Sequence, residues 1–77
     1  MINLNRSSIE NAAIIGTTVL PLNTCYYQKQ DGKYKIFHFG KLLIEAPWTD
    51  FAENGTPFAS EDDFVSYLNR TLFRALA

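Results

Sequence analysis

The clearest pattern of apolar and polar positions lies near the C-terminus, where apolar side chains recur at helical spacing. The residues that repeat at intervals of three or four are Phe64, Leu68, Leu72 and Ala75. This spacing is typical of an amphipathic helix with one buried face. Ser60 is a favourable N-cap, and the three acids that follow it lie at the positive end of the helix dipole. We therefore predict a C-terminal helix over residues 60–76.

Two aromatic-rich runs flank Asp31-Gly32 and predict a β-hairpin. An Asp-Gly pair between such runs is the strongest short-range signal for a type I′ turn. With these residues in the turn, the register pairs Cys25 with His38 and Tyr27 with Ile36 on one face, and Tyr26 with Phe37 on the other. Both faces therefore carry apolar side chains, and we expect each to be covered. The helix can cover one face, which leaves the other for the N-terminal segment or a neighbouring chain.

The segments around this hairpin complete a small antiparallel meander. Residues 12–22 are rich in β-branched side chains and predict one or two short strands. Residues 42–46 predict a further strand. We expect residues 47–59 to form a loop or a short hairpin that turns at Asn54-Gly55.

Residues 1–11 show no regular pattern, and we expect an extended N-terminal arm. The chain is then a single α+β domain over residues 1–77, with a β-meander over 12–46 and one C-terminal helix packed on it. A chain of this length buries only about 60% of its unfolded surface, so its core is marginal. Because Cys25 is the one cysteine, an internal disulfide is excluded, and we expect stabilisation by self-association into a homo-oligomer.

The net charge of −1 does not favour a polyanion-binding protein. One alternative stays open on the hairpin over residues 26–41, where lysines alternate with aromatic side chains. The lysines are Lys29, Lys33, Lys35 and Lys41. Aromatic side chains on a cationic sheet are typical of modules that bind single-stranded nucleic acid. Lysines that discourage strand pairing at a solvated edge explain the same residues more simply, so we do not expect nucleic acid as a partner.

No catalytic or metal-binding constellation stands out. Cys25 and His38 pair across the predicted hairpin, and two copies would present a Cys₂His₂ zinc set, but such residues on half-buried strands are usually packing residues. Cys–His catalysis would also need an orienting group and an oxyanion hole. We therefore predict a protein that is not an enzyme and binds no metal or cofactor. No apolar run approaches the ~18 residues of a membrane helix, so we expect no membrane partner.

Residues 54–73 contain an ordered succession of features: an Asn-Gly turn, an aromatic residue, a serine helix cap, acids and a short helix ending in Leu-Asn. The succession reads Asn54-Gly-Thr-Pro-Phe-Ala-Ser-Glu-Asp-Asp-Phe-Val-Ser-Tyr-Leu-Asn69. It resembles a pattern in small virion proteins of tailed bacteriophages, among capsid-attached, neck and tail-associated subunits. The resemblance implies a structural role without catalytic residues, in a virion assembled in the host cytoplasm.

We therefore expect a non-enzymatic virion subunit in a decoration, cement or connector role, which binds itself and other virion proteins. Apolar side chains of the loop, the hairpin and the arm are the expected interface. They are Trp48, Phe51 and Phe58 in the loop, Tyr26, Phe37 and Phe39 in the hairpin, and Met1, Ile2 and Leu4 in the arm. For Trp48, a place as a lid over the core is an equal alternative. A small regulator that binds one host protein would use the same surfaces.

Overall fold

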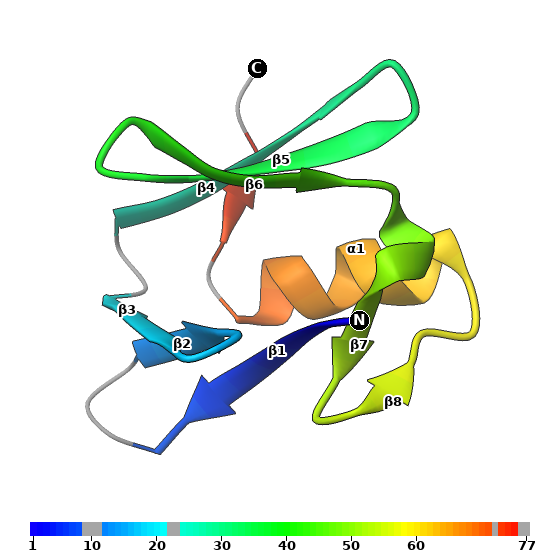
Figure 1. Ribbon diagram of the computed structural model, residues 1–77, viewed down its shortest axis with the longest axis horizontal. Coiled ribbons are helices and arrows are strands. Elements are labelled where there is room, and N and C mark those ends of the chain that lie inside the picture. Colours follow the sequence, from blue (N-terminus) through cyan, green and yellow to red (C-terminus); the bar gives the residue numbers. More distant parts are fainter. Residues whose placement is uncertain (9–11, 22–23, 72, 76–77) are drawn as a thin grey trace.

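The protein has the predicted α+β fold, in which strands dominate and one helix lies towards the C-terminus (Figure 1). The computed structural model describes residues 1–8, 12–21, 24–71 and 73–75. The strands form a five-stranded sheet and a four-stranded sheet, and the core contains side chains from both.

The order of strands differs from the order of the sequence in both sheets. The five-stranded sheet has the order β3 (Thr18–Pro21), β2 (Ala12–Ile15), β1 (Ile2–Ser7), β7 (Phe51–Glu53) and β8 (Thr56–Pro57). The four-stranded sheet has the order β6 (Lys41–Ala46), β5 (Lys33–His38), β4 (Cys25–Gln30) and β9 (Arg74–Ala75). A short 3₁₀ helix, η2 (Trp48–Asp50), precedes β7, and α1 spans Glu61–Arg70. The predicted meander is therefore divided between two sheets.

The predicted hairpin is present with its predicted register. β4 and β5 pair so that Cys25 lies opposite His38, and the chain turns at Asp31 and Gly32. These turn residues have φ angles of 53° and 77°, as a type I′ turn requires. The predicted turn at Asn54-Gly55 is also confirmed, and it joins β7 to β8.

A third turn of this kind joins β5 to β6 at Phe39 and Gly40, where φ is 52° and 75°. Glycine adopts this left-handed conformation freely, whereas a bulky side chain is strained in it. Phe39 is also 70% exposed, so burial of its ring does not offset the strain. The turn therefore holds an apolar ring in solvent at a conformational cost.

The N-terminal segment is a strand and not an arm, which corrects the prediction for residues 1–11. β1 is the central strand of the five-stranded sheet, antiparallel to β2 and parallel to β7. The alternation of Ile2 and Leu4 with two asparagines has the period of a strand with one buried face. The alternation covers only a few residues, but pairing with β2 on one side and β7 on the other stabilises β1. Residues 9–11 of the predicted arm lie outside the described residues.

The helix begins where the sequence predicts. Ser60 is the N-cap, and its side-chain oxygen accepts a hydrogen bond from the backbone N–H of Asp63 at 3.1 Å. Three acids occupy the first turn, and Phe64, Tyr67 and Leu68 are buried on the inner face. The N-terminal half of the predicted helix is therefore confirmed.

The helix ends at Arg70, which corrects the predicted end at residue 76. The Thr71 hydroxyl donates to the carbonyl oxygens of Tyr67 and Leu68 at 2.9 and 3.0 Å, an arrangement that competes with regular helical bonding. Residues 74 and 75 then form β9, which pairs in parallel with β4 and covers that edge of the sheet. Leu72 of the predicted apolar stripe, and residue 76 at the predicted end of the helix, lie outside the described residues.

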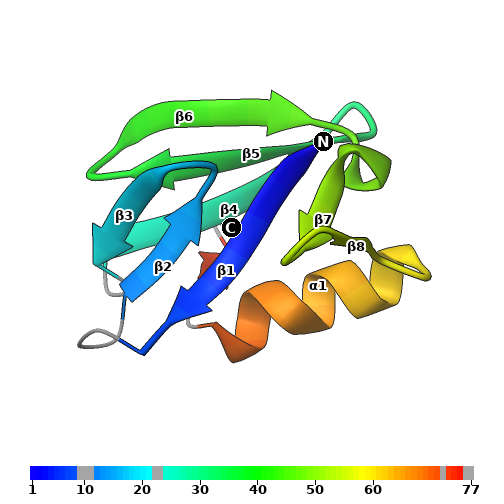
Figure 2. The same ribbon diagram turned by 60° about the horizontal axis from the view of Figure 1, so that its bottom comes forward.

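Figure 2 shows α1 on the side of the molecule opposite β6. A group of aromatic rings at the centre of the core joins this helix to both sheets. The ring of Phe64 lies 4.9 Å, between centroids, from Tyr34 of the four-stranded sheet and 4.9 Å from Phe51 of the five-stranded sheet. All three side chains are at most 3% exposed. Full burial of one such side chain contributes about 2 kcal/mol, so Phe64 is a principal link between the sheets.

Candidate functional site

Each sheet ends in two edge strands, and three of these four edges are short or contain a proline. β8 and β9 have two residues each, and β3 has four. Pro21 in β3 and Pro57 in β8 lack the N–H group that an added strand would bind. β6 has six residues and no proline. Among the described residues, β6 is therefore the long open edge.

A β-bulge in β6 exposes two adjacent leucines. Ile36 of β5 lies opposite Ile44, whereas the next residue, Phe37, lies opposite Leu42. Leu43 is therefore an extra residue in the strand. A regular strand would direct neighbouring side chains to opposite faces. With the bulge, Leu42 is 50% exposed and Leu43 is 42% exposed.

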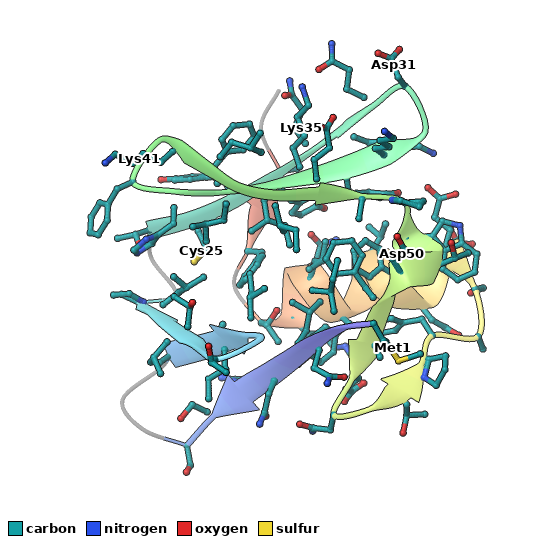
Figure 3. All side chains as sticks on the ribbon, viewed as in Figure 1. Met1, Cys25, Asp31, Lys35, Lys41 and Asp50 are labelled. Atoms are coloured by element: carbon teal, nitrogen blue, oxygen red, sulfur yellow. The ribbon has the colours of Figure 1, made fainter. Side chains whose placement is uncertain are left out.

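A shallow depression of about 390 Å³ lies beside β6. Leu43 and Ile44 line one side, Met1 contributes at the start of β1, and the tip of the β2–β3 hairpin contributes Gly16 and Thr17. In Figure 3 Met1 extends from the beginning of β1, and Lys41 lies at the start of β6 beside the β5–β6 turn. The depression is apolar on the β6 side and open to solvent.

We call the exposed apolar residues around this strand the β6 edge patch. Its members are Met1, Phe39, Leu42 and Leu43. Lys41 precedes the two leucines and Glu45 follows them, so the patch has a cation at one end and an anion at the other. Val19, the remaining exposed large apolar side chain among the described residues, lies in β3 and not in β6.

Seven of the nine predicted interface residues are at least partly accessible. Met1 and Phe39 are exposed and belong to the β6 edge patch. Tyr26 and Phe37 lie opposite each other and are half-buried, on the face of the four-stranded sheet away from the core. The other three of the seven, Ile2, Trp48 and Phe58, are half-buried and pack against the core. This position of Trp48 agrees with a lid over the core.

Phe51 and Leu4 are core residues, which corrects their assignment to the interface. Phe51 is fully buried and Leu4 is 2% exposed. Each faces the core from a strand inside the five-stranded sheet, and neither side chain can reach a partner in this structure.

The sequence did not single out Leu42 and Leu43, because both fit a strand that is buried together with Ile44. Two adjacent apolar residues in a strand are a signal for a bulge or for burial on both faces. The choice between these depends on how β6 pairs with β5, and turn chemistry alone does not fix that register.

Two ionisable groups with shifted pKa values, Tyr34 and Glu61, lie where the β4–β5 hairpin contacts α1. The Tyr34 hydroxyl donates to the Glu61 carboxylate, and Lys29 Nζ lies 2.7 Å from the same carboxylate. Burial, and then the bond to Glu61, raise the pKa of Tyr34 well above its ordinary value. The bonds from Lys29 and Tyr34 lower the pKa of Glu61. A neutral tyrosine bonded to a carboxylate anchors the helix and supplies neither nucleophile nor base.

Cys25 and His38 lie opposite each other as predicted, but Cys25 is directed into the core. Its side chain is 1% exposed, and Sγ donates to the carbonyl oxygen of Pro21 at 3.4 Å. Burial raises the pKa of the thiol, which disfavours the thiolate that binds metals. Within the described parts of the chain, no three His, Cys, Asp or Glu side chains gather as metal ligands would. The Cys25 thiol is therefore buried away from the surface at which a second copy could share a metal ion.

The aromatic residues of the predicted nucleic-acid surface are divided between two faces. Tyr27 and Tyr34 are buried in the core, whereas Tyr26 and Phe37 lie on the opposite face. Lys35, on that face, donates to the Gln30 side chain and lies 3.9 Å from Glu45. The continuous alternation of lysine and aromatic residues in the sequence is therefore not one surface.

A second depression, of about 520 Å³, lies between α1 and the β7–β8 hairpin. Its charged lining residues are Glu53, Asp63 and Arg70. Because both signs of charge are present, the depression has no evident preference for an anionic or a cationic ligand.

Comparisons with known proteins give no family to which these surfaces can be related. The chain matches no protein-family profile, no curated protein and no solved structure. No helix in the described ranges is long and apolar enough to cross a membrane.

Proposed function

We propose that the protein is a non-enzymatic structural subunit of a bacteriophage virion, which associates with itself and docks on capsid, neck or tail proteins. The observation that carries the proposal is the β6 edge patch. It combines an open six-residue edge strand with three exposed side chains, Phe39, Leu42 and Leu43, on or beside that strand.

Two properties of the patch favour a protein partner. β6 lacks the proline and the short length that limit the other three edges, and it carries exposed apolar side chains that a partner can cover. The chain is also small, so the free energy of unfolding of an isolated copy is limited by its core. Burial of the patch against a partner adds the apolar burial that the core of one copy lacks.

The virion part of the proposal rests on the resemblance of residues 54–73 to small virion proteins. The structure contains the features that carry it: the Asn54-Gly55 turn, the Ser60 cap and the acidic first turn of α1. These features build a compact hairpin and helix. They position α1 against both sheets and leave the β6 edge on the other side of the molecule free for assembly (Figure 2).

Light scattering of the purified protein over a range of concentrations tests the assembly function. We expect a concentration-dependent oligomer for the wild type. A variant with Leu42→Ser and Leu43→Ser should associate more weakly, by more than about tenfold, because two exposed apolar side chains are lost from the contact. Val19→Ser, which removes an exposed apolar side chain from β3, is the matched control and should behave as the wild type.

Two results would count against the proposal. One is a wild-type protein that stays a folded monomer at every concentration. The other is an equal loss of association in the serine variants of β6 and of β3. That result would indicate non-specific hydrophobic association and not a defined interface. Circular dichroism of each variant shows that the fold is retained.

A further inference from the structure

We infer that Asn54-Gly55 is a site of spontaneous deamidation, and that the side chain of Asn3 protects it in the folded protein. The reaction is the attack of a backbone nitrogen on an asparagine side chain, and it needs no enzyme and no ligand. Two hydrogen bonds that attach the turn to β1 oppose it. Neither Asn3 nor Asn54 belongs to the β6 edge patch, and the reaction is independent of the proposed function.

Asn54 is the one asparagine of the chain that precedes a glycine. In the reaction, the backbone nitrogen of Gly55 loses its proton and forms a bond to Asn54 Cγ. The bond from Cγ to the side-chain nitrogen breaks, and ammonia leaves. Water then opens the cyclic imide at one of its two carbonyl groups and gives aspartate or isoaspartate. A side chain at position 55 would crowd the attack, whereas glycine lets other atoms approach its backbone closely.

The turn is open to the water that the second step consumes. Asn54 and Gly55 join β7 to β8, and both residues are exposed. Nothing lies within 4 Å of the position that a Cβ of Gly55 would take. Access of water therefore does not limit the reaction, and the geometry of the turn does.

The two hydrogen bonds hold both N–H groups of the turn against β1. The N–H of Asn54 donates to the Leu4 carbonyl oxygen at 3.1 Å. The N–H of Gly55, which contains the attacking nitrogen, donates to Asn3 Oδ1 at 3.0 Å. The attack requires this group to lose its proton and to move towards Asn54 Cγ, so the bond to Asn3 must break first. Asn3 therefore opposes both the deprotonation and the movement.

The backbone conformation of the turn adds to this protection. Asn54 and Gly55 have φ angles of 50° and 85°, the left-handed values of a type I′ turn. Reacting atoms must come to about 3–3.5 Å with aligned orbitals before a bond forms. The nitrogen of Gly55 approaches Cγ by rotation about the Cα–C bond of Asn54, and this rotation takes Asn54 out of the turn conformation.

The acceptor is held by paired strands on both sides. Asn3 lies in β1 opposite Ala52 of β7, beside which it runs in Figure 1. On the other side, the Asn3 carbonyl oxygen accepts a hydrogen bond from the Gly16 N–H at 2.9 Å. Its backbone is therefore fixed, and only side-chain torsions have to be set for the bond to Gly55 to form again after it breaks.

The two products affect the turn differently. Aspartate keeps the backbone and adds a negative charge next to Glu53. Isoaspartate inserts a methylene group into the backbone, which changes the path of the turn and displaces the Gly55 N–H from Asn3. We expect the isoaspartate form to melt at a lower temperature than the unmodified chain, because the same hairpin contains the buried Phe51.

Incubation at mildly alkaline pH, followed by peptide mass spectrometry, measures the reaction at Asn54. Deamidation replaces an NH₂ group by OH and so raises the mass of the peptide. Folded Asn3→Ala should deamidate about fivefold faster than the folded wild type, which is the factor that the net stabilisation by one hydrogen bond represents. The wild type unfolded in urea should react faster than either folded protein.

Three variants isolate the role of the hydrogen bond. Asn3→Asp keeps an acceptor oxygen and should react as slowly as the wild type. Asn5→Ala removes the other asparagine side chain of β1, which forms no hydrogen bond to the turn among the described residues, and should leave the rate unchanged. Tyr34→Phe removes a hydrogen bond between β5 and α1 without touching the turn, and should also leave the rate unchanged. Circular dichroism of each variant shows that the fold is retained.

Several results would overturn the inference. Equal rates for folded wild type and Asn3→Ala would show that Asn3 gives no protection. An equal acceleration in Asn3→Ala and Tyr34→Phe would show that protection comes from global stability and not from the bond to Gly55. An unfolded wild type that gains no mass at Asn54 would show that this turn is not a deamidation site. None of these results changes the oligomeric state, so the proposed function is tested separately.

Discussion

Phe39 combines two unfavourable properties in one residue. Its backbone has a φ of 52°, and its ring is 70% exposed. A left-handed conformation costs a residue with a Cβ roughly 1–2 kcal/mol, and the two other turns of this type place Asp31 and Asn54 at the same position. A residue that is unfavourable for the folded monomer is readily explained if its side chain acts in a contact.

We predict that Phe39→Asn stabilises the monomer and weakens its association. Asparagine adopts the left-handed conformation more readily, so the free energy of unfolding should rise by about 1 kcal/mol in urea denaturation at low protein concentration. Phe39→Ala is the matched variant, because it removes the ring and keeps a Cβ in the strained position. It should weaken association without the gain in stability. A loss of stability in Phe39→Asn would show that the ring is needed by the fold itself.

At the scale of elements, α1 is attached to the four-stranded sheet at both ends. The Tyr34 hydroxyl and Lys29 bind Glu61 in the first turn, and the Tyr27 hydroxyl donates to the Asn69 side chain at 2.7 Å near the last turn. Between these contacts the aromatic rings around Phe64 pack against both sheets. The polar contacts therefore fix the position of a helix that apolar burial already holds.

The anchor at Glu61 predicts a loss of stability in both acid and alkali. The pKa of Glu61 is lowered by folding, so its contribution is present above the ordinary carboxyl value of 4.5 and is lost as the pH falls below it. The pKa of Tyr34 is raised by folding, so its contribution is present below the ordinary value of 10.0 and is lost as the pH rises above it.

Urea unfolding of Tyr34→Phe and Glu61→Gln across this pH range checks the prediction. Tyr34→Phe should cost about 1 kcal/mol at neutral pH, and its difference from the wild type should shrink above pH 10. Glu61→Gln should approach the wild type as the pH falls below 4.5. Differences that stay constant at both extremes would mean that these groups do not titrate differently in the folded and unfolded chains.

Local chemistry explains which elements the sequence could predict. The turns at Asp31-Gly32 and Asn54-Gly55 and the Ser60 cap each depend on neighbouring residues, and each is present as predicted. β9 depends instead on parallel pairing with β4, and β1 pairs in parallel with β7 as well as antiparallel with β2. Both parallel partners are distant in the sequence. No turn signal marks such pairings, so β1 was predicted as an arm and β9 as the end of the helix.

The candidate site was less predictable than the fold for the same reason. Exposure of Met1 and Phe39 agrees with the predicted interface, whereas Leu4 and Phe51 are buried and Leu42 and Leu43 are exposed. Which apolar residue faces solvent depends on strand order and on a bulge in β6. Both are properties of the complete sheet and not of the residues in one strand.

At the scale of the whole molecule, the described residues form one long open edge and a small core, and these two properties are thermodynamically linked. A partner that binds the folded chain and not the unfolded chain stabilises it by mass action. If copies associate through β6, the folded state should gain stability as the protein concentration rises. A strictly monomeric domain of the same sequence would unfold at a temperature that does not depend on concentration.

We therefore predict that the melting temperature of the wild type rises with protein concentration, by about 5 °C when the concentration passes from well below the dissociation constant to roughly tenfold above it. Differential scanning calorimetry measures the shift. The variant with Leu42→Ser and Leu43→Ser should melt at one temperature throughout, while Val19→Ser should follow the wild type. A melting temperature of the wild type that stays constant over this range would show that the β6 edge is not buried by self-association, and the stability of this short chain would then come from its own core alone.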